Sequence, residues 1–94
     1  MTDDSTRLLQ VFSGGVKIIG QSPQALTDNI ITLKKIVIVN SIMTPQGIKP
    51  EMVYVEKNED YLGEVTIHQG PGVTIFIVNT NGPLAKQYFD TISP

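Results

Sequence analysis

His68 is the only histidine in the 94-residue chain, so it is the first candidate for acid–base chemistry. A histidine base needs a nucleophile or an orienting acid within hydrogen-bond reach. No serine, threonine or acidic residue stands at a spacing from His68 that is typical of such an arrangement. A lone histidine in a strand is usually structural or solvated, and we therefore expect that the protein is not an enzyme.

The remaining chemistry-bearing groups give no sign of a metal or a cofactor. The acidic residues are scattered and lack the tight local cluster of a calcium-binding loop. Because the chain has no cysteine, it has neither a disulfide framework nor a thiolate metal site. The turn Gly70–Gly72 could offer backbone N–H groups to a phosphate, but it lacks the following helix and the lysine of a phosphate-binding loop. We expect no bound metal and no cofactor.

The stretch from Tyr61 to Val78 has strand composition on both sides of Gly70–Gly72. Before this turn, Val65 and Ile67 alternate with polar residues, which is the period of a half-buried strand. After the turn, apolar side chains occupy both faces: Val73, Ile75 and Ile77 on one, Phe76 and Val78 on the other. A chain this short seldom covers a strand on both faces and both edges, so the pattern favours a partner subunit.

A β-hairpin is predicted near the N-terminus. The runs Leu8–Phe12 and Val16–Gln21 flank Ser13-Gly14-Gly15, whose glycines suit a tight turn. Pro23 marks the end of the second run, because proline has no N–H to donate to a strand ladder. Before the hairpin, Thr2–Ser5 could cap a short helical turn.

Further along the chain, the β-branched run Ile36–Val39 predicts a central strand over residues 33–42. Two prolines and a glycine predict a loop over residues 44–50, after which Met52–Val55 begins another strand. Pro83 suits the first position of a short helix, and one apolar face of that helix is outlined by Leu84, Ala85, Tyr88 and Phe89. These patterns give five or six strands and one helix in a single domain.

Residues Leu62–Ile67 read Leu-Gly-Glu-Val-Thr-Ile, and the apolar run Val73–Ile77 follows. This order resembles the second signature of the Sm-like proteins, in which Leu-Gly-Glu-Val-x-Ile runs into Arg-Gly and an apolar last strand. The hairpin turn and the pair Gly20-Gln21 are similar to the opening of the bacterial branch, Hfq. Where that family has Arg-Gly, this chain reads His68-Gln69-Gly70, which is one residue longer and lacks the arginine.

The first Sm-like signature has a loop aspartate followed by an asparagine that contacts a base. The resemblance assigns these places to Asp28 and Asn29, although a register shifted by three puts Thr32 at the asparagine position. A plain alternative is that Asp28 and Asn29 form a turn pair whose side chains bond their own backbone.

The resemblance implies an all-β fold: a small, strongly bent, five-stranded and partly open barrel over residues 1–94, with a short C-terminal helix. It also implies a homo-oligomeric ring of about five to seven subunits. Such a ring holds single-stranded RNA near its pore, with contacts from Asp28, Asn29, His68, Gln69 and Gly70. The alternative is a ring-forming scaffold for other proteins that has lost RNA binding together with the arginine. The compact, divergent sequence is similar to phage-carried members of the family.

Charge and hydropathy limit the surroundings of the protein. Seven basic and nine acidic residues give a net charge of -2, so no basic field attracts nucleic acid from a distance. This balance favours the scaffold alternative. The longest apolar run, Ile36–Val39, is far shorter than the roughly 20 residues of a membrane-spanning helix. Asp3-Asp4 replaces the basic start of a signal peptide, so we expect a soluble, cytoplasmic protein without a membrane partner.

Overall fold

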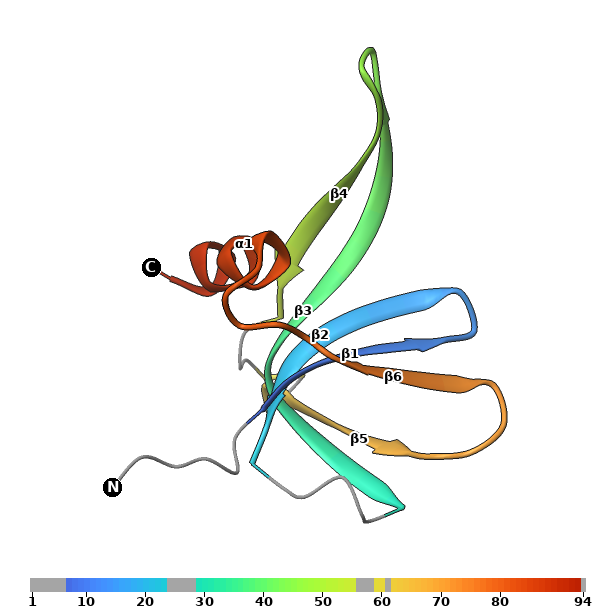
Figure 1. Ribbon diagram of the computed structural model, residues 1–94. Coiled ribbons are helices and arrows are strands. Elements are labelled where there is room, and N and C mark those ends of the chain that lie inside the picture. The colour runs from blue at the N-terminus through green and yellow to red at the C-terminus, as the bar shows by residue number, and fades with distance from the viewer. Residues whose placement is uncertain (1–6, 24–28, 56–58, 61, 94) are drawn as a thin grey trace.

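The structure, a computed structural model, describes residues 7–23, 29–55, 59–60 and 62–93. These residues form one antiparallel sheet and one C-terminal helix (Figure 1). In chain order the elements are β1 (Arg7–Ser13), β2 (Val16–Ser22), β3 (Ile30–Thr44), β4 (Gly47–Tyr54), β5 (Glu64–His68), β6 (Val73–Ile77) and α1 (Pro83–Ile92). The predicted mainly β class and the short C-terminal helix are therefore confirmed. The helical turn expected at Thr2–Ser5 lies outside the described residues.

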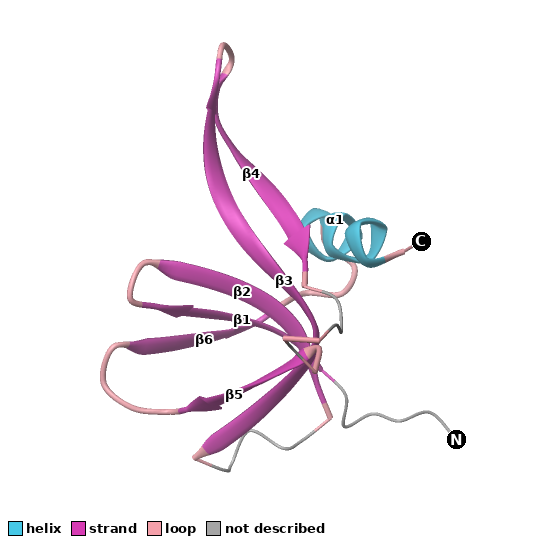
Figure 2. Cartoon of the chain, turned by 180° about the vertical axis from the view of Figure 1, so that it is seen from behind, coloured by secondary structure: helices cyan, strands magenta, loops and turns pink. Residues whose placement is uncertain are grey.

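Over the described residues the sheet contains six strands, which is the higher of the two counts that the sequence allows. Its order is β4-β3-β2-β1-β6, and β5 pairs separately with β3. The predicted hairpin of β1 and β2 is confirmed, with Gly14 and Gly15 as its turn. The two strands on either side of Gly70–Gly72 are also present, but each pairs with a different neighbour (Figure 2). Over the described residues, the sheet is therefore strongly bent but not closed.

The long strand β3 causes the bend. Its second half pairs with β4 from Val37 opposite Tyr54 onward, and its first half pairs with β5 from Lys34 opposite Glu64. Between these two ladders lie only two residues of β3. On the other side, nine residues of the same chain lie between Tyr54 of β4 and Glu64 of β5. Lys35, one of the two β3 residues, has a φ of 53°. A left-handed residue inside a strand interrupts the pleat and turns the chain, so β3 bends where its partner changes from β4 to β5.

The β3–β4 hairpin extends away from the other strands (Figure 1). The loop predicted over residues 44–50 is wrong, because pairing continues to Thr44 opposite Gly47 and leaves only Pro45 and Gln46 in the turn. The Thr44 hydroxyl helps to close this turn by donating to the Gly47 carbonyl at 2.7 Å. Pro50 lies within β4, which ends the strand order on one side. An edge strand tolerates proline because one side of its backbone makes no ladder bonds.

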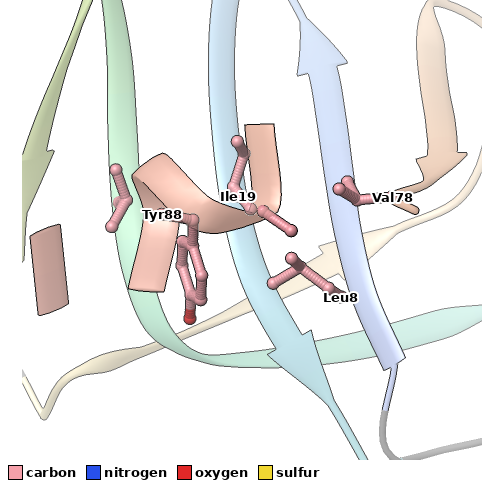
Figure 3. Close-up of a cluster of buried hydrophobic side chains, with 6 residues drawn as sticks. Leu8, Ile19, Val78 and Tyr88 are labelled. Carbon is pink, nitrogen blue, oxygen red and sulfur yellow. The ribbon is translucent and has the colours of Figure 1, made fainter. Parts of the chain in front are cut away.

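Apolar side chains form a cluster on each face of the sheet. The first cluster lies under α1 and contains Leu8, Ile19, Val37, Val78, Ala85 and Tyr88 (Figure 3). The second contains Leu9, Val11, Ile31, Leu33 and Ile36, with Val73 and Ile75 of β6 packed against it. Part of the apolar surface predicted on the two faces of β6 is therefore buried within a single chain. Phe76 and Ile77, however, remain 53% and 62% exposed.

Tyr88 connects α1 to the bend of β3 through a hydrogen bond. Its side chain is fully buried, and its hydroxyl donates a hydrogen bond to the Lys35 carbonyl at 2.6 Å. Burial raises the pKa of Tyr88, and a hydrogen bond with the Gln21 side chain lowers it in part. The helix is therefore bonded to the carbonyl of Lys35, which is the one non-glycine residue with a positive φ among the described residues.

Raising the pH through about 10 should destabilise the folded protein through Tyr88. The pKa of Tyr88 is higher in the folded than in the unfolded protein. The stability that comes from this pKa difference is fully present below the ordinary phenol pKa of about 10, and it is lost as pH rises through the folded pKa. Urea unfolding by circular dichroism at about pH 8 and about pH 11 tests this. The parent should lose more free energy of unfolding than Tyr88→Phe, which has no phenol to ionise. Equal losses in the two proteins would show that Tyr88 is not responsible.

Candidate functional site

The structure brings together two of the segments that the sequence singles out. The β3–β5 ladder ends at Ile30 opposite His68. One residue beyond it, the Gln69 N–H donates to the Asn29 carbonyl at 2.8 Å. The side chains of Asn29, His68 and Gln69 are all exposed. The end of β3 and the end of β5 therefore lie side by side and carry three exposed residues, which we call the turn site, together with Gly70.

The chain after the turn site is held by a tight turn. The Val73 N–H donates to the Gly70 carbonyl at 3.1 Å, which closes a four-residue turn. Pro71 occupies its second position and Gly72, with a φ of 84°, its third. This combination suits a type II turn, because proline fixes a negative φ and glycine accepts a positive one. Gln69 and Gly70 are consequently anchored between a strand ladder and a closed turn.

The turn site offers neutral hydrogen-bonding groups. Asn29 and Gln69 each carry an amide with a donor and an acceptor end, and a neutral His68 adds one of each. Such groups match the edges of unpaired bases better than they match phosphates, which are bound mainly by cations. Gly70 has open space around it, since an added Cβ would meet nothing within 4 Å. Asp28, the fifth predicted site residue, lies outside the described residues.

Thr32, the alternative to Asn29, has a different environment. It lies inside the β3–β5 ladder opposite Thr66 and is half-buried. Asn29 lies before the first strand residue and is exposed. An exposed amide at the end of a strand is better placed to reach a ligand than a hydroxyl within the ladder, so Asn29 is the better candidate for a base contact.

A cavity next to His68 was not foreseen from the sequence. It has a volume of about 280 Å³ and lies between the β1–β2 hairpin and β5, with Ser13, Thr66 and His68 among its mainly apolar lining. A second cavity, of about 190 Å³, lies between β2, β3 and the start of β5, and Glu64 is the one charged residue among the described residues that line it. Each cavity is formed by strands that are distant in sequence, so no local pattern could have indicated it.

No group of three or more histidine, cysteine, aspartate or glutamate side chains is placed to hold a metal ion in the described part of the chain. Within residues 7–23, 29–55, 59–60 and 62–93, no helix combines the length and the apolar character needed to cross a membrane.

Comparison with known proteins gave no match: no family model, no curated protein and no solved structure is significantly similar to this chain.

Proposed function

We propose that this protein is an Sm-like RNA-binding protein that forms a homo-oligomeric ring and holds single-stranded RNA near the pore. The observation that supports this function most directly is the hydrogen bond between the Gln69 N–H and the Asn29 carbonyl. It joins the two segments to which the sequence resemblance assigns base contacts. The bent, open sheet is also compatible with a barrel of the Sm-like kind.

The unpaired edges of the sheet support assembly into a ring. Over the described residues, β4 and β6 each have a strand partner on one side only. An unpaired strand edge carries free N–H and C=O groups and is a template for pairing with another chain. Pairing of β4 in one subunit with β6 in the next is a head-to-tail contact, which closes into a ring when the rotation between subunits is right. Symmetry then repeats the turn site around the axis.

Substitution of the amides tests the proposed RNA contact. Asn29→Ala and Gln69→Ala should each weaken binding of labelled oligo-U or oligo-A about tenfold, roughly 1.4 kcal/mol, as expected for one lost polar contact. Asn40→Ala and Gln46→Ala are matched controls, because they remove exposed amides from the β3–β4 hairpin. Fluorescence anisotropy measures the affinities, and light scattering checks that every ring stays intact. Parent-like binding by both turn-site variants would rule out this site.

The salt dependence of binding should distinguish base contacts from phosphate contacts. With a net charge of -2, the protein should bind RNA weakly and with a shallow dependence of log affinity on log salt. A steep salt slope with nanomolar affinity in the parent would contradict the proposed contacts.

A second candidate function is a ring that holds other proteins and does not bind RNA. The observation that favours it is the excess of nine acidic over seven basic residues, together with the missing arginine of the Arg-Gly turn. A ring without measurable affinity for either oligonucleotide would support this alternative. In both cases we propose a cytoplasmic setting, which the absence of cysteine supports.

A further inference from the structure

Two exposed phenylalanine rings lie on the sheet face that α1 covers in part. Gln10 of β1 stands opposite Ile19 of β2 and opposite Phe76 of β6. Ladder partners share a face, so Gln10 and Phe76 lie on the same face as Ile19, which is buried in the cluster under α1. Phe12 is two residues from Gln10 along β1 and shares this face as well.

The helix leaves these rings uncovered. Ile19 is completely buried, whereas Phe12 is 39% and Phe76 is 53% exposed. Phe12 stands opposite Thr74, so Phe76 is its diagonal neighbour on the adjacent strand. Diagonal neighbours in an antiparallel pair are about 7–8 Å apart, which allows one ligand to contact both rings. The two rings therefore form one accessible aromatic surface.

Polar side chains surround the rings on the same face. Phe12 has Lys17 opposite it on β2 and Thr74 opposite it on β6, and both are exposed. Gln10 is half-buried beside Phe76. We call these five residues the aromatic patch: Gln10, Phe12, Lys17, Thr74 and Phe76. Its one charged member is a cation, although the chain as a whole has a net charge of -2, so the patch is complementary to an anionic ligand.

We propose that the aromatic patch is a stacking surface for unpaired bases of single-stranded RNA. Exposed aromatic residues on a sheet stack bases, a lysine beside them neutralises phosphate, and amide or hydroxyl groups bond base edges. The alternation of Lys, Gln and Thr with the two rings favours such a ligand over an apolar protein surface. This inference rests on the proposed RNA binding but adds a second contact, on strands that do not form the turn site.

Replacement of each ring by leucine tests the stacking. Leucine keeps an apolar side chain but has no π face, so Phe12→Leu and Phe76→Leu should each weaken oligo-A binding about tenfold, roughly 1.4 kcal/mol. Phe89→Leu is the matched control, because Phe89 is 41% exposed on α1, outside the patch, and its replacement should leave affinity unchanged. An abasic strand of equal length should bind the parent and both patch variants equally.

Lys17→Gln separates the phosphate contact from the stacking contact. This variant should reduce the salt slope of oligo-A binding by about one and weaken binding to every sequence alike. Its effect should persist with the abasic strand, which retains the phosphates. A salt slope identical to that of the parent would show that Lys17 contacts no phosphate.

The outcomes distinguish this inference from the proposed function. If Asn29→Ala and Gln69→Ala weaken binding while both phenylalanine variants bind like the parent, the aromatic patch is not an RNA site. If the phenylalanine variants instead change the mass of the ring by light scattering, the patch is a contact between copies, and the inference is overturned. If the parent binds no oligonucleotide, both the inference and the proposed RNA binding fail.

Discussion

A purified sample of the protein should have a light-scattering mass of about five to seven chains at micromolar concentration. The physical reason lies at the two ends of the strand order. Both β4 and β6 leave one backbone edge unpaired over the described residues, and β6 also exposes the apolar side chain of Ile77. Strand pairing between subunits satisfies these backbone groups and covers this side chain at the same time.

Ile77→Lys should dissociate the ring into monomers. Ile77 is 62% exposed in one chain, so a lysine there leaves the fold intact but places a charge in the proposed contact between β6 and the next subunit. Ile75 is a poorer choice, because it packs against the cluster around Leu9 and Val11. Its substitution would test folding as well as assembly.

Met43→Lys is the control for the assembly experiment. Met43 is 82% exposed near the end of the β3–β4 hairpin and lies on β3, outside β4 and β6, the two strands proposed to pair between subunits. Its variant should retain the mass of the parent. A monomeric parent, or an Ile77→Lys protein with an unchanged mass, would contradict the ring.

Gly20→Ala should lower the free energy of unfolding by about 2 kcal/mol, equivalent to a fall in Tm of roughly 10 °C. A Cβ at Gly20 would lie 2.9 Å from the Leu33 Cβ and 3.3 Å from the Lys34 carbonyl oxygen. Leu33 is fully buried in the second cluster and cannot move aside freely. The β2–β3 register also shifts between Ile19 and Gln21, so the two strands approach closely where the sheet bends.

Gly70→Ala provides the matched comparison for stability. A Cβ at Gly70 meets nothing within 4 Å, and its φ lies outside the positive range that favours glycine. The unfolding midpoint of this variant, followed by circular dichroism, should stay within about 0.5 kcal/mol of the parent. If Gly20→Ala is as stable as Gly70→Ala, the close approach of β2 and β3 is not important for the fold.

Local patterns predicted the elements whose causes are local. The β1–β2 hairpin follows from two apolar runs around Gly14 and Gly15, and α1 begins at Pro83 as expected. The loop prediction over residues 44–50 was wrong because Pro50 lies on an edge strand. Proline excludes a central strand but not an edge strand, and edge position is a property of the whole sheet.

Features that depend on distant pairings had no local signal. The residues around Lys35 do not indicate a left-handed residue inside β3. That conformation depends on the change of strand partner from β5 to β4 at this point and on the hydrogen bond from the Tyr88 hydroxyl. At the turn site, the sequence resemblance named Asn29 and Gln69, but only the β3–β5 register places them together. The aromatic patch has the same origin, since Phe12 and Phe76 meet only through the pairing of β1 with β6.

The stoichiometry of RNA binding tests the central claim most directly. Labelled oligo-U and oligo-A should be titrated with the parent protein at low salt, and the mass of the complexes should be measured by light scattering. If a ring holds one strand near its pore, binding should saturate at one oligonucleotide per ring, because the turn sites repeat around a single axis. The absence of binding at every accessible concentration, or saturation at one oligonucleotide per subunit, would contradict a pore that holds RNA.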